Sequence, residues 1–275
     1  MSIDVEDYFQ VAAFEGRVSR GDWAGIETRV VDNTERALAM FGAANVKATF
    51  FTLGWVAERF PSLIRDIVAA GHELASHGSD HYRATTQTPA QFRDDIRRAK
   101  DVLEEHGGVA VRGYRAPSYS IGRTNLWAFD ELAEAGYEYS SSVYPIVHDL
   151  YGMPEAPRFA FRLADTGLLE VPVTTLRLRG RNLPFGGGGY FRLMPYSVYR
   201  RGFARVNAVD RQPGLFYFHP WEIDPQQPRV SGLSARSRFR HYLNLDRMAP
   251  RLTRLLQDFR WDRMDRVFLP EAASS

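Results

Sequence analysis

The chain has 275 residues, of which 44% are apolar and 25% are charged, so it can bury one large core. Its net charge is +2, which gives little support for a nucleic-acid partner, and none is expected. The absence of cysteine excludes disulfides and thiolate metal sites. The sequence has no run of about 18 apolar residues, the length that a transmembrane helix needs. No N-terminal signal-peptide pattern is evident. As written, the sequence predicts a cytoplasmic protein without a transmembrane segment, or a periplasmic or membrane-associated one if the true start lies upstream.

In chain order, the predicted elements alternate between strands and helices. The helix that begins at Pro61 ends at Gly71, and a longer one begins at Thr88 and ends at Gly107-Gly108. This alternation favours a parallel sheet or barrel of βα units. Strands are predicted at residues 2–4, 45–53, 72–76, 109–114, 137–143, 168–173 and 214–218. The other predicted helices begin at Asp32, span residues 126–135, and begin at about Pro250. The last of these helices is expected to pack as a lid on the outside of the barrel.

Polar clusters directly follow four of these predicted strands. They lie at residues 4–7, 77–81 and 115–119, and at His219. Because ligands and catalytic groups of such folds lie where the parallel strands end, we expect the four clusters to meet in one site.

Two of the clusters together predict a metal site. His77 and His81 are four residues apart, a spacing that lets two imidazoles face one ion. Alone, these histidines fit a helix cap or a core equally well, and the acidic cluster Asp4, Glu6 and Asp7 fits a solvated turn or a helix N-cap. Together they favour a site for a divalent cation, with Zn²⁺ preferred and Co²⁺ or Ni²⁺ as alternatives.

A glycine run flanked by aromatic residues occupies positions 185–191. It lacks the Gly-Lys-Ser/Thr ending of a phosphate loop. We therefore interpret it as a loop that closely approaches a ligand or the sheet, in preference to a nucleotide-binding loop.

With these residues in view, the sequence resembles the NodB-homology polysaccharide deacetylases of carbohydrate esterase family 4, in particular the exosortase-associated exopolysaccharide branch. The resemblance covers the whole chain and implies a distorted (β/α)7-type barrel as one domain over residues 1–275, with branch-specific loops and a C-terminal helix within residues 158–275. The motifs that carry it are Ser-Ile-Asp-Val-Glu-Asp at 2–7, His-x-x-x-His at 77–81, Arg-Ala-Pro-Ser-Tyr at 115–119 and Phe-Tyr-Phe-His-Pro-Trp-Glu at 216–222, with 148–152 and 186–193 as the branch's own extensions.

The resemblance also implies a role for each matching position. Asp4 matches the general base, and His77 and His81 match the metal ligands. Arg115 matches the residue that pairs with the base, and we expect its charge to lower the pKa of Asp4. Tyr119 matches the position whose backbone N–H completes the oxyanion hole, and His219 matches the general acid. The implied activity is metal-dependent removal of N-acetyl groups from N-acetylhexosamine units of a bacterial polysaccharide or oligosaccharide.

The sequence departs from the family pattern at two places. The family has adjacent aspartates, whereas Val5 follows Asp4, so the carboxylate ligand must be Glu6 or Asp7. Alternation along the strand favours Glu6, and a turn there would favour Asp7. The later aspartate that orients the acid is also missing, with Asp149 or Glu222 as substitutes.

Three other functions compete with N-deacetylation. One is hydrolysis of a small amide or cyclic imide on the same fold. Another is a glycosidase that pairs Asp4 with Glu170, and a third is an inactive carbohydrate-binding protein. The oligomeric state is not predicted. The aromatic candidates for stacking on sugar rings are Tyr119, Tyr144, Tyr151, Tyr190 and Trp221.

Overall fold

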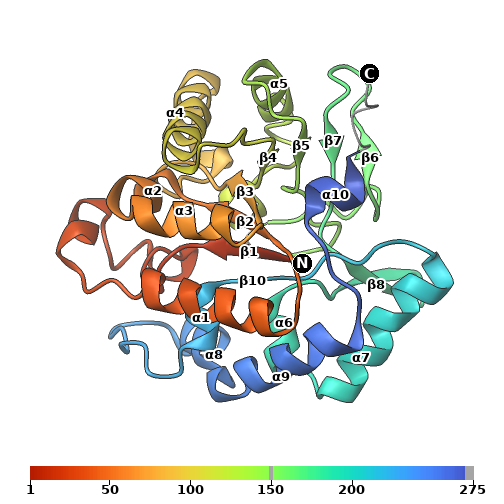
Figure 1. The fold of residues 1–275 in the computed structure, drawn as a ribbon. Coiled ribbons are helices and arrows are strands. Elements are labelled where there is room, and N and C mark those ends of the chain that lie inside the picture. Colours follow the sequence, from red (N-terminus) through yellow and green to blue (C-terminus); the bar gives the residue numbers. More distant parts are fainter. Residues whose placement is uncertain (149–150, 270–275) are drawn as a thin grey trace.

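An eight-stranded, curled sheet forms the centre of the computed structural model, which describes residues 1–148 and 151–269 (Figure 1). The strand order is β10-β1-β2-β3-β4-β5-β7-β6, and the sheet forms a half-barrel. Paired strands are parallel except β6 and β7, which are antiparallel. Strands β8 and β9 form a separate antiparallel hairpin. The predicted α/β fold is confirmed.

Most strands are short, and helices separate the first five of them. The strands are β1 (Ser2–Val5), β2 (Thr49–Thr52), β3 (Glu73–Ser76), β4 (Gly113–Tyr114), β5 (Tyr139–Ser140), β6 (Phe161–Arg162), β7 (Leu169–Glu170), β8 (Thr175–Leu178), β9 (Arg181–Pro184) and β10 (Tyr217–Phe218). The α-helices are α1 (Val30–Ala43), α2 (Gly54–Arg59), α3 (Pro61–Ala69), α4 (Pro89–Gly107), α5 (Ala128–Glu134), α6 (Gly188–Leu193), α7 (Tyr196–Arg205), α8 (Ala235–Tyr242), α9 (Leu245–Asp258) and α10 (Met264–Phe268).

Helices α3 and α4 have boundaries that their sequences explain. Helix α3 begins at Pro61, whose missing N–H costs nothing in the first turn. A capping box closes the start of α4, because the Thr88 side chain accepts from the Gln91 N–H and the Gln91 side chain accepts from the Thr88 N–H. Gly108 ends α4 with a φ of 64°, a left-handed conformation that favours glycine.

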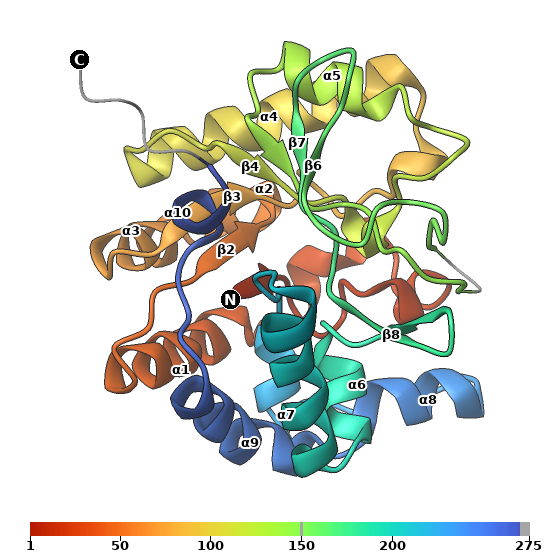
Figure 2. The same ribbon diagram turned by 90° about the vertical axis from the view of Figure 1, so that its right-hand side faces the viewer.

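The core lies on both faces of the curled sheet because neighbouring strand residues point to opposite sides. On the outer face, α1, α7 and α9 pack against β1, β2 and β10, whereas α4 and α5 pack against β3 and β4. These two groups of helices lie below and above the strands in Figure 1. On the inner face, Phe51 and Ala75 contact a cluster that includes Met264 of α10. Figure 2 shows α10 beside β2 and β3.

The second half of the chain differs more from the sequence-based expectation. Helix α9 begins at Leu245 and contains Pro250, because Leu245 and Met248 extend the buried stripe toward the N-terminus. Helices α6, α7 and α8 and the β8–β9 hairpin were not predicted, and α10 follows the helix that was expected to be last. Across the part of the chain that the structure describes, no helix is both long and apolar enough to span a membrane.

Candidate metal centre and active site

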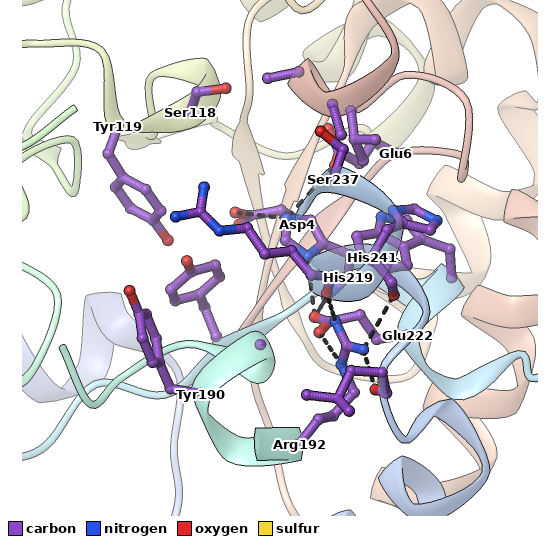
Figure 3. Close-up of a pocket in the computed structure, with 18 of the residues that line it drawn as sticks. Asp4, Glu6, Ser118, Tyr119, Tyr190, Arg192, His219, Glu222, Ser237 and His241 are labelled. Carbon is purple, nitrogen blue, oxygen red and sulfur yellow. Dashed lines mark hydrogen bonds and ion pairs between the residues drawn. The ribbon is translucent and has the colours of Figure 1, made fainter. Parts of the chain in front are cut away.

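The four polar clusters predicted to meet do so at the carboxyl ends of β1, β3, β4 and β10. They surround one cavity of about 560 Å³. Figure 3 shows Tyr119 and Tyr190 on one side of this pocket and His219, Glu222 and His241 on the other. The lining includes the predicted site residues Asp4, Glu6, His77, His81, Tyr119 and His219.

Glu6, His77 and His81 form a group that could hold a metal ion. One ligand atom from each lies within 4.8 Å of the other two, and all three side chains are buried. His81 Nε2 and Glu6 Oε2 are 2.8 Å apart. His77 Nδ1 donates to the Arg115 carbonyl at 2.8 Å, which leaves the Nε2 lone pair for a ligand.

The charges of this group also suit a divalent cation. Burial lowers the pKa of His77 to about 4, so its imidazole is neutral at neutral pH, as a metal ligand must be. Burial alone would raise the pKa of Glu6, but the neighbouring His81 and His219 outweigh it and lower the pKa to about 2. Two imidazoles and one carboxylate form a donor set that Zn²⁺ accepts. The residues present therefore fit the metal that the sequence predicted.

Asp7 has a different environment. Its Oδ2 accepts hydrogen bonds from the backbone N–H groups of Arg29 and Val30 at 2.7 and 3.0 Å, at the start of α1. Its Oδ1 accepts from the Tyr8 N–H at 2.8 Å. Asp7 is absent from the group around the histidines. Of the two candidates that the sequence left open, the structure brings Glu6 to His77 and His81 and places Asp7 at a helix N-terminus.

Asp4 and Arg115 form a buried ion pair beside this group. Arg115 Nη1 lies 2.5 Å from Asp4 Oδ1, and Arg115 is fully buried. Arg115 also donates to Ser2 Oγ and to both the carbonyl and the hydroxyl oxygen of Ser141. Ser2 and Ser141 therefore fix the guanidinium, which holds one carboxylate oxygen of Asp4. The other oxygen, Oδ2, lies 4.0 Å from His219 Nε2.

Tyr119 lies in a strained turn at the cavity wall. Ser118 and Tyr119 have φ values of 55° and 51°, the left-handed region that non-glycine residues rarely adopt. The Tyr119 N–H donates to the Ala116 carbonyl at 3.0 Å. An oxyanion role for this N–H, as the resemblance implies, requires that hydrogen bond to be shared. The Tyr119 hydroxyl is buried and has no hydrogen-bond partner within residues 1–148 and 151–269.

His219 directly follows β10 and is oriented by Glu222, three residues later in the 3₁₀ turn η6 (Pro220–Ile223). His219 Nδ1 donates to Glu222 Oε2 at 3.0 Å, and the His219 backbone N–H donates to the same oxygen at 3.0 Å. His219 Nε2 lies 3.5 Å from Glu6 Oε1. Burial opposes protonation, but Glu222 and Glu6 together raise the pKa of His219 to about 9. Of the two predicted partners, Glu222 makes this contact, and Asp149 lies outside the described residues.

Arg192 is a member of this site that the sequence analysis missed. It belongs to α6, is 1% exposed, and its Nε donates to Glu222 Oε1 at 2.8 Å (Figure 3). Burial would raise the pKa of Glu222, but the charge of Arg192 and the hydrogen bond from His219 lower it to about 2. The only signal in the sequence was an arginine inside an apolar stretch after the glycine run.

The glycine run approaches the sheet closely, as predicted, but the prediction of a loop is wrong from Gly188 onward, where α6 begins. Gly187 forms a parallel bridge with Tyr217 beside β10. A Cβ atom at Gly188 would lie 2.3 Å from Glu222 Oε2, so a larger residue there would displace the carboxylate that orients His219. The glycine run therefore contacts both the edge of the sheet and the carboxylate that orients His219.

The other named residues divide between the cavity and the core. Tyr151, Tyr190 and Trp221 line the cavity with Tyr119, whereas Tyr144 is fully buried outside the lining. Glu170 is also fully buried outside the lining, and its Oε1 accepts from the N–H groups of Ser142 and Val143. A glycosidase that pairs Asp4 with Glu170 gains no support from this position.

Two family models match consecutive parts of the chain. Residues 24–140 match the model of polysaccharide deacetylase, and residues 141–269 match a domain of unknown function, DUF3473. The resemblance to polysaccharide deacetylases is thereby supported, at the level of the family's domain. His219, Glu222 and Arg192 all lie in the second part.

Curated relatives support the same domain. A peptidoglycan deacetylase of Helicobacter pylori is 31% identical over 127 residues, which are 46% of this chain and 40% of the relative. A peptidoglycan-N-acetylglucosamine deacetylase of Bacillus cereus is 31% identical over 36% of each chain. A chitooligosaccharide deacetylase of a Bradyrhizobium species is 37% identical over 32% of this chain and 38% of its own. The chain thus spans less than half the length of these curated relatives.

Solved structures support the fold. A structure from Mycobacterium smegmatis, described as a polysaccharide deacetylase, has a TM-score of 0.60 at 22% identity, and the match covers 97% of this chain and 87% of that one. A Puue allantoinase has a TM-score of 0.58 at 17% identity with the same coverage. At these identities the likeness shows a shared fold.

Proposed function

We propose that this chain is a metal-dependent N-deacetylase that removes acetyl groups from N-acetylhexosamine units of a bacterial polysaccharide. One observation carries the proposal: the Glu6, His77 and His81 group, Asp4, which is paired with the buried Arg115, and the His219–Glu222 pair all line one cavity. Amide hydrolysis without a covalent intermediate needs an activated water, a stabilised oxyanion and a proton donor. The three groups supply residues suited to these three needs.

The metal would be held by His77, His81 and Glu6. When bound, a divalent cation supplies Lewis-acid polarisation of the amide carbonyl and a more acidic water. Asp4 takes a proton from the attacking water, while Arg115 fixes the carboxylate so that Oδ2 remains available. Tyr119 and Tyr190 bound the pocket opposite His219 and limit where the sugar ring can lie.

Proton donation to the departing nitrogen falls to His219. Its raised pKa of about 9 keeps the imidazole protonated near neutral pH, so Nε2 carries a proton to donate. The hydrogen bond from Nδ1 to Glu222 fixes the ring and directs Nε2 into the site. The base Asp4 and the acid His219 thus approach the cavity from adjacent strands, β1 and β10.

The test is release of acetate from N-acetylglucosamine oligomers. We expect protein purified with Zn²⁺ or Co²⁺ to release acetate, chelation to stop the release, and His77→Ala to lose both metal binding and activity. His106→Ala is the matched control, because His106 lies on α4 outside the cavity and its loss should leave the rate unchanged. Release that is absent, or indifferent to chelation and to His77→Ala, would contradict the proposal.

A second proposal concerns which polysaccharide is the substrate. We propose an exopolysaccharide of the kind handled by the exosortase-associated branch, because the extensions at 148–152 and 186–193 resemble that branch. An oligosaccharide panel that includes peptidoglycan fragments checks this choice. A clear preference for peptidoglycan would assign the protein to a different substrate within the same chemistry.

A further inference from the structure

Arg192 joins three segments of the chain around the carboxylate that orients His219. Its Nε donates to Glu222 Oε1 at 2.8 Å, its Nη2 donates to the Arg240 carbonyl at 3.2 Å, and its Nη1 donates to the carbonyls of His241 and Leu243. The carbonyl acceptors lie at the C-terminal end of α8, where the helix dipole favours a cation. A buried guanidinium is therefore satisfied on every nitrogen and presents one N–H to Glu222.

Glu222 is consequently held at both of its oxygens. Oε2 accepts the two hydrogen bonds from His219, and Oε1 accepts the one from Arg192. Gly188, four residues before Arg192 on α6, leaves just enough room for the carboxylate. A carboxylate fixed in this way cannot rotate, so the imidazole that it holds cannot rotate either.

We propose that Arg192 is a positioning residue for proton donation, and that the segment of unknown function supplies this chain's proton-donor assembly through Arg192, Glu222 and His219. The inference rests on the proposed deacetylase function for the acid role of His219. The inference goes beyond that function by assigning Arg192, whose hydrogen bonds and ion pair go to Glu222 and to the end of α8 and not to the metal-ligand candidates. The assembly takes the place of the aspartate that the sequence lacks.

Substrates with different leaving groups can show whether Arg192 positions the general acid or only stabilises the fold. Amide hydrolysis needs a protonated nitrogen to leave, whereas an activated aryl ester expels a stable phenolate without help. Loss of the acid should therefore slow amide hydrolysis and spare ester hydrolysis. Damage to the metal group or to the cavity should slow both.

The experiment compares Arg192→Lys with wild type on N-acetylglucosamine oligomers and on 4-nitrophenyl acetate. We expect kcat for the amide to fall by about 10- to 100-fold, a part of the contribution typical of general acids, and kcat for the ester to change by less than about threefold. Arg200→Lys is the matched control, because Arg200 pairs with Asp258 outside the cavity, and both rates should be retained. Equal losses on amide and ester would overturn the inference.

A double-mutant cycle shows whether Arg192 acts through Glu222. In a Glu222→Gln background, Arg192→Met should cause almost no further loss of amide hydrolysis, because the contact is already broken. This double variant also removes both buried charges together, which protects folding if a single substitution fails. Additive losses in the cycle would contradict the assignment.

An NMR measurement tests the role of Arg192 independently of the proposed deacetylase activity. The His219 Nδ1–H bonded to Glu222 should give a downfield proton resonance in wild type that weakens or disappears in Arg192→Lys. Should wild type hydrolyse neither substrate, the deacetylase proposal fails, and the resonance alone decides the role of Arg192. An unchanged resonance in Arg192→Lys would refute that role.

Discussion

At the scale of single residues, Glu6 and Asp7 show how adjacent carboxylates acquire different tasks. The strand β1 ends at Val5, and Glu6 still faces the histidines, whereas Asp7 turns toward the first N–H groups of α1. Alternation along the strand favoured Glu6 from the sequence. The hydrogen bonds to Arg29 and Val30, 22 and 23 residues away, had no local signal.

This difference predicts opposite effects for two conservative substitutions. Glu6→Gln should lose metal affinity by at least tenfold, because the ligand's charge disappears. Asp7→Asn should keep the affinity and lower the free energy of unfolding by about 0.3–1 kcal/mol, because the amide oxygen still accepts from the N–H groups of α1 and only the charge at the helix N-terminus is lost. Zinc titration by calorimetry and urea unfolding of both variants make the measurement. If Asp7→Asn loses the metal and Glu6→Gln keeps it, the ligand assignment is reversed.

His72 predicts a dependence of stability on pH. Its side chain is buried between Phe41 and Phe50, its Nδ1 accepts from the Ala48 N–H, and burial lowers its pKa from 6.5 to about 4. Between these two values the unfolded chain binds a proton that the folded chain does not. Stability is therefore complete above pH 6.5 and declines as the pH falls toward 4.

His72→Asn should remove this contribution while its side-chain oxygen keeps an acceptor near Ala48. We expect the slope of unfolding free energy against pH, between pH 6.5 and 4, to fall by up to about 1.4 kcal/mol per pH unit, the value for one proton. Urea unfolding at several pH values measures it. Parallel curves for variant and wild type would show that His72 does not titrate on unfolding.

At the scale of elements, the first half of the chain was more predictable than the second. Helices α3 and α4 were located to within about two residues because Pro61, Gly71, Thr88 and Gly107 mark their ends. Helix α6 has no such marks, since it begins inside a glycine run. Its position follows from contacts with β10 and Glu222, which only the folded chain brings together.

The same limit applies to the site. Each strand-end cluster was visible in the sequence because the site residues directly follow short predicted strands. Arg192 was not visible, because its partners Glu222, Arg240 and Leu243 are 30 to 51 residues away and belong to no repeating pattern. Tertiary contacts of this length leave no periodic signal.

The glycine run itself gives a prediction at this scale. Gly188→Ala would place a methyl group 2.3 Å from Glu222 Oε2 and should destabilise the protein by about 1–3 kcal/mol. Gly189→Ala meets nothing within 4 Å and should raise stability by up to about 1 kcal/mol through helix propensity. Thermal unfolding of the two variants is the check. Similar effects of both would mean that Glu222 moves away freely.

At the scale of the whole molecule, the two segments matched by different family models share one sheet. Strand β10 of the second segment pairs with β1, and β7 pairs with β5. The outer core around β1 and β2 likewise combines Ile3 and Phe50 with Phe218 and Leu252. The prediction of a single domain over residues 1–275 therefore has a physical argument in its favour, although a truncation has to test it.

A chain that ends at residue 140 should not fold on its own. It would lack β10 and α9, expose Ile3 and Phe50 to water, and leave β1 as an edge strand whose β10 side is unpaired and open to aggregation. The full chain should unfold in one cooperative transition, and the 1–140 fragment should show a collapsed amide spectrum by NMR and no cooperative urea transition. A dispersed spectrum with cooperative unfolding for the fragment would establish two domains, and the proton donor would then be delivered across a domain boundary.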